Sequence, residues 1–134
     1  MAVEMELSRI LIRELNDFQL IELQEVGGDR SFPIVIGLPE AQAIERRLKG
    51  IEIKRPQTHE LMANIIEQLG AELESITISD LSEHTFFATL NLRRNGEALQ
   101  IDSRPSDAIA LGVAGGVPIY VEEHVLDAAQ SDPQ

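Results

Sequence analysis

The rest of the chain is organised around one short stretch, residues 101–108, which reads Ile101-Asp102-Ser103-Arg104-Pro105-Ser106-Asp107-Ala108. Proline disfavours a helical conformation for the residue before it, and proline itself suits the first position of a helix. The pair Arg104-Pro105 therefore predicts the point at which a strand ends and a helix begins. This boundary carries two carboxylates, one guanidinium and two hydroxyls. Few other places in the chain hold so many reactive side chains.

Two interpretations of this boundary follow from the residues. In the structural one, Ser103 or Ser106 caps the helix and Asp107 complements the positive end of its dipole. Arg104 then pairs with Asp102 to hold the corner. In the functional one, Asp102 and Asp107 converge on a metal ion or a water, and Arg104 holds an anion near the helix N-terminus. The residues alone leave both interpretations open.

A hairpin leads into this stretch. Asn95-Gly96 is the pair that a type I′ turn requires, and a two-residue loop fixes the register of the strands on either side. The register sets Arg94 opposite Glu97, Leu92 opposite Leu99, Leu90 opposite Ile101 and Thr89 opposite Asp102. We expect the four aliphatic residues to share the core face of the sheet. Asp102 then lies on the opposite, polar face.

The rest of the chain alternates between runs of strands and single helices. Strands are predicted at 5–14, 18–26, 31–37, 73–79, 85–92 and 118–121, and helices at 38–50, 58–70, 105–114 and 123–129. The pattern favours an α+β fold with a mainly antiparallel or mixed sheet and three to four helices. Pro33 favours an edge position for its strand. A second Arg-Pro pair, Arg55-Pro56, also precedes a helix, which raises the hypothesis of a duplicated strand-helix unit.

Length and composition predict one globular domain. The 134 residues are 43% hydrophobic and 25% charged, and residues 1–129 are expected to form the domain, with 130–134 as a frayed tail. The chain has no cysteine, which excludes disulfide scaffolds and cysteine-ligated zinc. Its three histidines are scattered. No stretch is typical of a membrane span or a signal peptide, so the expected compartment is the cytoplasm.

The formal net charge is −12, which disfavours non-specific binding to nucleic acid because that affinity comes from cations that neutralise phosphates. The charge is unevenly distributed. Residues 46–55 hold five basic residues, Arg46, Arg47, Lys49, Lys54 and Arg55, against Glu52 alone. This run is either a local basic stripe that can contact phosphates or a solvated helix face, and the second is the commoner case.

Four motifs in order resemble the bifunctional nuclease (BFN) domain family of bacteria and plants. They are Ile36-Gly37 with Glu40-Ala41, Arg55-Pro56 with Thr58-His59-Glu60-Leu61, the run from Asp102 to Leu111, and Pro118-Ile119. The resemblance covers residues 5 to 128. It implies an α+β domain that associates as a homo-oligomer, a dimer or a small ring, and nuclease activity on RNA and DNA.

The first functional hypothesis is therefore a nuclease that cleaves phosphodiester bonds with the help of Mg²⁺ or another divalent cation. His59, Asp102 and Asp107 are the candidate catalytic residues, with His59 as general base or acid. The other expected site residues are the metal ligands Glu40, Asp102 and Asp107 and the substrate-binding residues Arg55, Thr58, Arg104 and Ser106. Metal dependence is inferred from the acids, and a metal-free mechanism is left open.

The second hypothesis belongs to another class: a non-catalytic, oligomeric regulatory domain whose two Arg-Pro corners bind an anionic ligand. Net charge favours this hypothesis, and the resemblance favours the first. Both hypotheses predict that the motifs meet. We expect Arg55, His59, Asp102, Arg104 and Asp107 to lie around one pocket.

Overall fold

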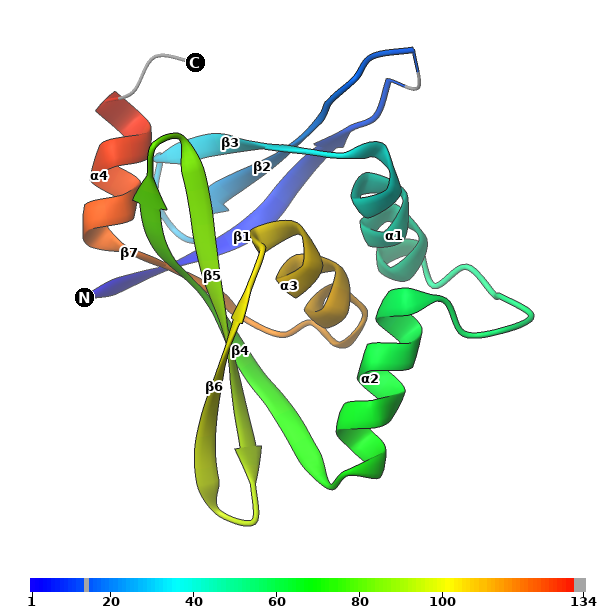
Figure 1. Ribbon diagram of the computed structural model, residues 1–134. Helices are drawn as coiled ribbons and strands as arrows, with labels where there is room; N and C mark the ends of the chain where they lie inside the picture. The colour runs from blue at the N-terminus through cyan, green and yellow to red at the C-terminus, as the bar shows by residue number, and fades with distance from the viewer. Residues whose placement is uncertain (14, 132–134) are drawn as a thin grey trace.

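The computed structural model describes residues 1–13 and 15–131. In this part of the chain it contains seven strands in one mixed sheet, four α-helices and one short 3₁₀ helix, so the predicted α+β fold is confirmed (Figure 1). The elements are β1 (Ala2–Leu11), β2 (Gln19–Glu25), β3 (Ser31–Ile36), α1 (Leu38–Lys49), α2 (Thr58–Gln68), β4 (Ala71–Ser82), β5 (Thr85–Arg94), β6 (Glu97–Ser103), α3 (Pro105–Gly112), η1 (Val113–Gly115), β7 (Ile119–Glu122) and α4 (Glu123–Ser131).

The strand order is β3-β2-β1-β7-β4-β5-β6. The short strand β7 joins two antiparallel halves, because it pairs antiparallel with β1 and parallel with β4. The core runs through both halves and includes Ile21, Ile76, Val121 and Ile109, each of which is at most 1% exposed. No described helix is long and apolar enough to cross a membrane.

The hairpin formed by β5 and β6 has the register that the sequence predicts, from Arg94 opposite Glu97 to Thr89 opposite Asp102. Its turn residues Asn95 and Gly96 have φ of 52° and 81°, as a type I′ turn requires. The prediction that the four aliphatic residues of this hairpin are buried is correct for β5 and wrong for β6. Leu90 and Leu92 on β5 are buried, but Leu99 and Ile101 on β6 are 38% and 48% exposed. The reason is that β6 is an edge strand, beyond the helices that cover β5.

The opposite edge of the sheet is β3, so the edge position predicted from Pro33 is confirmed. The predicted ends of two elements differ from the structure. The first strand ends at Leu11 rather than continuing toward residue 14, which lies outside the described residues. Gln130 and Ser131, expected in a frayed tail, belong to α4, while residues 132–134 lie outside the described part of the chain.

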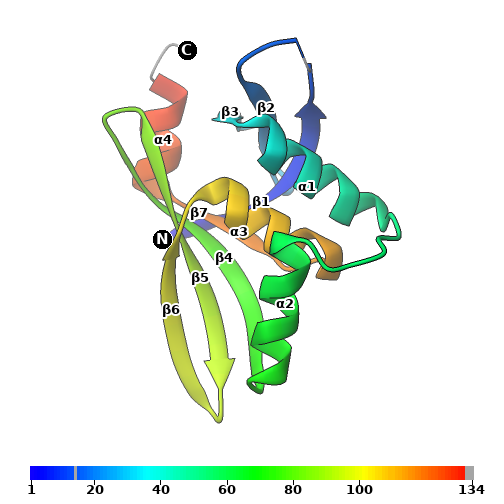
Figure 2. The same cartoon turned by 45° about the vertical axis from the view of Figure 1, so that its right-hand side comes forward.

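Helix α3 is the buried centre of the helical layer. It begins directly after β6, with Arg104 in an extended conformation and Pro105 at its first position, as predicted. All of its residues except Asp107 are buried, and the helix contacts α1, α2, β4 and β5. Figure 2 shows α3 between α1 and α2, with α4 apart from the other three helices.

The second Arg-Pro pair has a different setting. Residues 51–57 connect α1 to α2 directly and contain no strand. The hypothesis of a duplicated strand-helix unit is therefore wrong, because its first copy lacks the strand. The two pairs share only the local effect of proline before a helix.

Candidate active site

The first turns of three helices meet at one cavity. Glu40 lies in the first turn of α1, His59 in the first turn of α2 and Asp107 in the first turn of α3. The cavity has a volume of about 220 Å³ and is lined by Pro39, Glu40, Ala43, Arg46, Gln57, Thr58, His59, Arg104 and Asp107. A helix N-terminus presents unpaired N–H groups and a positive dipole end. Three such ends around one cavity favour anionic groups there.

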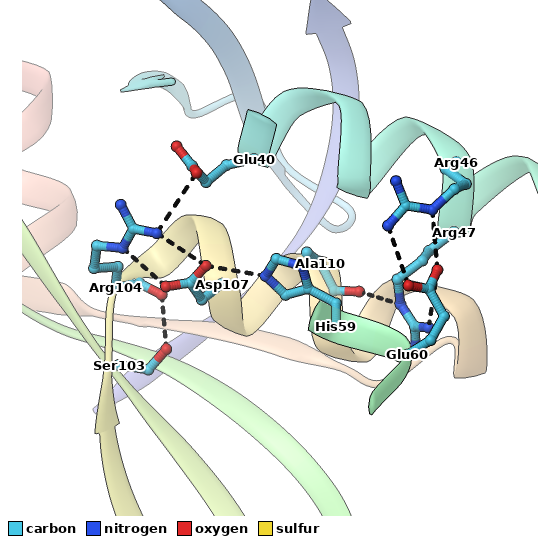
Figure 3. Close-up of polar contacts among 9 residues, drawn as sticks. All are labelled: Glu40, Arg46, Arg47, His59, Glu60, Ser103, Arg104, Asp107 and Ala110. Carbon is cyan, nitrogen blue, oxygen red and sulfur yellow. Dashed lines mark hydrogen bonds and ion pairs between the residues drawn. The ribbon is translucent and has the colours of Figure 1, made fainter. Parts of the chain in front are cut away.

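Asp107 is the centre of the polar contacts (Figure 3). Its Oδ1 lies 3.0 Å from Nε2 of His59, a residue 48 positions away in sequence. Arg104 donates from Nε to Oδ2 at 2.8 Å and from Nη2 to Oδ1 at 3.1 Å. The carboxylate therefore binds a guanidinium through both of its oxygens and orients an imidazole at the same time.

These contacts fix the charge of Asp107. Burial by itself would raise the pKa of this carboxyl, but the hydrogen bonds from Arg104 and His59 outweigh burial and hold the pKa below its ordinary value. The same hydrogen bond to Asp107 raises the pKa of Arg104. Asp107 is thus an ionised carboxylate at neutral pH where it contacts His59 and Arg104.

Glu40 approaches the site from the other side of Arg104. Its Oε2 lies 3.7 Å from Nη2 of Arg104, which is a loose ion pair next to the tight one with Asp107. Gly37 precedes the helix, and a Cβ at this position would clash with Oε1 of Glu40. The glycine in the Ile36-Gly37 motif therefore leaves space for the carboxylate of Glu40.

The structural interpretation of residues 101–108 is correct for Asp107, which lies in the first turn of α3, and wrong for the serine caps and for the partner of Arg104. No side chain caps α3 by a hydrogen bond. Ser103 donates to the carbonyl oxygen of Arg104, and Ser106 is buried. Arg104 binds Asp107, within the helix, rather than the expected partner Asp102.

Arg46 and Arg47 form a second cluster with Glu60. Arg46 binds both carboxylate oxygens of Glu60, at 3.0 Å and 3.1 Å. Arg47 donates to the carbonyl oxygens of Ala110 and Leu111 at 2.6 Å and 3.0 Å, at the C-terminal end of α3. The hydrogen bond from Arg46 lowers the pKa of Glu60, and burial opposes this effect. Arg46 and Arg47, the first two residues of the basic run at 46–55, are thus bound to other parts of the protein. At these two positions the run is neither a free basic stripe nor a solvated helix face.

The structure brings together five of the eight residues expected at the site. Glu40, Thr58, His59, Arg104 and Asp107 all line the 220 Å³ cavity. Ser106 lines a larger cavity next to it, and Arg55 and Asp102 line neither of the two. Arg55 is exposed in the connection between α1 and α2, and Asp102 is exposed on β6. The expected convergence is therefore confirmed for His59, Arg104 and Asp107, but not for Arg55 and Asp102.

The proposed metal ligands do not fit a metal ion in this arrangement. Within residues 1–13 and 15–131, no three His, Asp or Glu side chains are grouped closely enough to hold one. Both oxygens of Asp107 are bonded to other side chains, and Glu40 faces a guanidinium. A divalent cation usually needs several carboxylate or carbonyl oxygens turned toward one point. We therefore derive no chemical step through a metal.

One charged residue of the cavity was missed as a site residue. Arg46 lines the cavity, although the sequence indicated it only as part of the basic run. A signal for it exists in the sequence: Pro39, Ala43 and Arg46 follow the i, i+4, i+7 spacing of one helix face. Its partner Glu60 belongs to the next helix, and that pairing has no local signature.

The arrangement supports proton transfer beside an anion-binding group. Nε2 of His59 faces Asp107, so Nδ1 is the ring nitrogen that can exchange a proton with a bound molecule. A histidine oriented by a carboxylate is the common form of a general base. Arg104 uses Nε and Nη2 on Asp107, and among the described residues its Nη1 has no hydrogen-bond partner. That nitrogen can bind an anion.

Comparison with known proteins identifies the family to which this sequence is related. A family model described as the bifunctional nuclease domain matches residues 21–134. An uncharacterized protein of Mycobacterium tuberculosis is 41% identical over 126 residues, which are 94% of this chain and 75% of that protein.

More distant relatives carry functional names. "Bifunctional nuclease 2" of rice (Oryza sativa subsp. japonica) is 28% identical over 100 residues, or 72% of this chain, and "Bifunctional nuclease 1" of Arabidopsis thaliana is 25% identical over 104 residues, or 75%. The matched segments are 31% and 32% of those two plant proteins, so the chain spans about a third of their length. The family model matches most of the chain and the mycobacterial relative is similar over nearly all of it; the chain belongs to the bifunctional nuclease domain family.

Proposed function

We propose that this protein is a nuclease that hydrolyses phosphodiester bonds in RNA and DNA, with His59 as general base. The observation that carries the proposal is the 3.0 Å contact between His59 and Asp107 in a cavity that Arg104 also lines. Family membership supports the reaction class, and the plant relatives are named as bifunctional nucleases.

The proposed step needs only water and the residues of the cavity. Nδ1 of His59 takes a proton from a water while the water oxygen bonds to phosphorus. The bond from phosphorus to the leaving oxygen breaks, and that oxygen takes a proton from solvent. Asp107 stabilises the imidazolium that forms, and Arg104 stabilises the charge on the phosphoryl oxygens. Because the attacking group is water, the mechanism serves RNA and DNA alike.

The ion pairs already present in the cavity weaken its attraction for a phosphate. Arg46 and Arg104 are the two cations of the cavity, and each already faces at least one carboxylate. A phosphate must therefore compete with Glu40 for Arg104, whose side chain is 63% exposed and whose ion pair with Glu40 is long. The net charge of −12 adds a repulsive field. We expect slow turnover, and cleavage that weakens as salt screens the remaining attraction.

The direct test is cleavage of single-stranded RNA and DNA by the purified protein and by Asp107→Asn. The variant loses the ionised carboxylate that orients His59, so we expect activity on both substrates to fall by at least about 100-fold. Asp80→Asn is the matched control, because Asp80 forms an exposed pair with His124 at 3.6 Å, away from the cavity. It should cleave like the wild type. Each assay is run with Mg²⁺, with Mn²⁺ and with chelator.

Equal cleavage by the wild type and Asp107→Asn would mean that a contaminating nuclease produces the signal. The regulatory alternative would then be preferred, since the site pairs its cations with carboxylates in the manner of a structural network. If cleavage is lost with chelator but retained with Mg²⁺ or Mn²⁺, the chemistry would instead be assigned to a metal bound with the help of substrate.

We infer further that the chain forms a homo-oligomer through β6. This edge strand has seven residues, no proline, no basic residue and no irregularity in its pairing with β5. It also exposes Leu99 and Ile101. Edge strands without protective features pair readily with another strand. The other edge, β3, carries Pro33, which lacks a donor.

A second copy of β6 fits this edge by an antiparallel, two-fold pairing centred on Gln100. In a two-residue hairpin the pair that closes the turn is hydrogen-bonded, and the pattern alternates along the strands. Ala98, Gln100 and Asp102 therefore direct their backbone groups outward. Pairing centred on Gln100 sets Asp102 opposite Ala98 of the second copy and Glu97 opposite Ser103, so no like charges face each other.

Gln100→Pro should convert the oligomer to a monomer, because it removes an outward N–H and leaves the pairing with β5 intact. Ile101→Lys should act in the same direction by adding a charge to the exposed face. Leu48→Lys is the control, since Leu48 is 51% exposed on α1. Light scattering after size-exclusion chromatography measures the mass. A wild-type monomer at micromolar concentration, or an oligomer that Gln100→Pro leaves unchanged, contradicts this interface.

A further inference from the structure

A second and larger cavity adjoins the candidate active site. It has a volume of about 440 Å³, within the range of roughly 300–1,000 Å³ typical of small-molecule sites. It shares Glu40 and Arg104 with the smaller cavity, so the two cavities adjoin at this ion pair. The additional walls come from the turn between β1 and β2, from β3, and from the start of β5.

The charges of this cavity disfavour a phosphate. Its titratable groups are the carboxylates of Asp17 and Glu40, the imidazole of His84 and the guanidinium of Arg104, and the guanidinium already faces Glu40 and Asp107. The hydroxyls of Thr85 and Ser106 also line it. Carboxylates and hydroxyls accept hydrogen bonds from neutral N–H groups. A neutral, planar ligand with amino groups therefore suits the cavity better than a second anion.

The apolar walls suit a flat ring. Phe18 is 54% exposed and Val35 is 53% exposed, although both are large apolar residues. Phe86 lines the same cavity and is stacked on the buried ring of Phe32, with centroids 5.5 Å apart. One aromatic ring is thus held in place by the core, and another is presented to solvent. Exposed aromatic rings of this kind are the usual platforms for unpaired bases.

We propose that this cavity binds one unpaired nucleobase of the strand whose phosphate occupies the neighbouring 220 Å³ cavity. The inference rests on the proposed nuclease function and adds a substrate class to it: single-stranded nucleic acid, or a nucleotide extruded from a duplex. A base inside a duplex is stacked and paired, so it cannot enter the cavity. Bases with an exocyclic amino group, which can donate to Asp17, are bound in preference to uracil and thymine.

The test is binding, measured by fluorescence anisotropy with a short labelled oligodeoxynucleotide and its abasic counterpart. A His59→Gln background prevents cleavage during the measurement. Phe18→Ala should raise the Kd for the normal strand by about five- to thirtyfold, the lower part of the range for loss of one stacked base. The Kd for the abasic strand should not change, and Phe18→Trp should restore binding of the normal strand.

Phe87→Ala is the matched control, because Phe87 is 40% exposed and follows Phe86 on β5 but does not line the cavity. If Phe18→Ala weakens both strands equally, or neither, the base site is refuted. The two proposals fail separately. If the wild type cleaves DNA but the His59→Gln protein binds normal and abasic strands alike, the nuclease proposal stands and the base site is refuted. If the His59→Gln protein prefers the normal strand but the wild type does not cleave it, the base site stands and the nuclease proposal is refuted.

Discussion

His59→Gln should lower kcat/KM for both RNA and DNA by roughly 10²- to 10⁴-fold, the contribution typical of a positioned general base. Glutamine keeps a polar side chain of similar reach that can still donate to Asp107, but it cannot accept a proton from water. The fold should be preserved, because the pair with Asp107 can be replaced by a neutral hydrogen bond. Initial rates at several substrate concentrations give kcat and KM separately.

The control for this prediction is His124→Gln. His124 is 66% exposed and faces Asp80 at 3.6 Å, so it reproduces the histidine–carboxylate pair outside the cavity. A second comparison uses His59→Gln together with Asp107→Asn. Residues that act as a unit lose little more when both are changed than when one is. If the two losses multiply instead, His59 and Asp107 contribute independently and the proposed general-base pair is wrong.

Arg47→Met should lower the free energy of unfolding by roughly 2–4 kcal/mol, because it removes charged hydrogen bonds to two carbonyl oxygens at a buried helix end. The side chain of Arg47 is only 10% exposed, and its partners are the carbonyls of Ala110 and Leu111 and, at 3.8 Å, the carboxylate of Glu60. Methionine retains most of the packing volume. Urea denaturation followed by circular dichroism measures the change at constant slope.

Arg93→Met provides the matched control. Arg93 also binds a carboxylate and a carbonyl oxygen, those of Glu74 and Gly96, but its side chain is 47% exposed. Exposed pairs contribute little, so we expect a loss below about 1 kcal/mol. Similar losses for the two variants would show that the hydrogen bonds of Arg47 do not stabilise the end of α3 beyond an ordinary surface contact.

Local chemistry explains the features that could be predicted from the sequence. Asn95-Gly96 defines a type I′ turn and with it the register of β5 and β6, because a two-residue loop permits one pairing. Pro105 fixes the start of α3, since the constraint of proline acts on its immediate neighbour. Pro33 places β3 at an edge, because a residue without an N–H cannot donate to a neighbouring strand.

Tertiary structure decided the contacts between distant residues. Periodicity shows that Leu99 and Ile101 share a face with Leu90 and Leu92, but not that the helices stop short of β6 and leave this part of the face exposed. In the same way, the sequence identifies His59 as a polar residue at the start of a helix. That its partner would be Asp107 depends on the packing of α2 against α3.

Neighbouring residues are thus enough to define the start of α3, the hairpin register and the family motifs. The packing of α1 and α2 against α3 determines which polar residues line the 220 Å³ cavity. It placed His59, Arg104 and Asp107 there, added Arg46, and left Arg55 and Asp102 outside. The physical reason is that side chains far apart in sequence meet only when the buried faces of their helices are packed together, and no local pattern encodes that geometry.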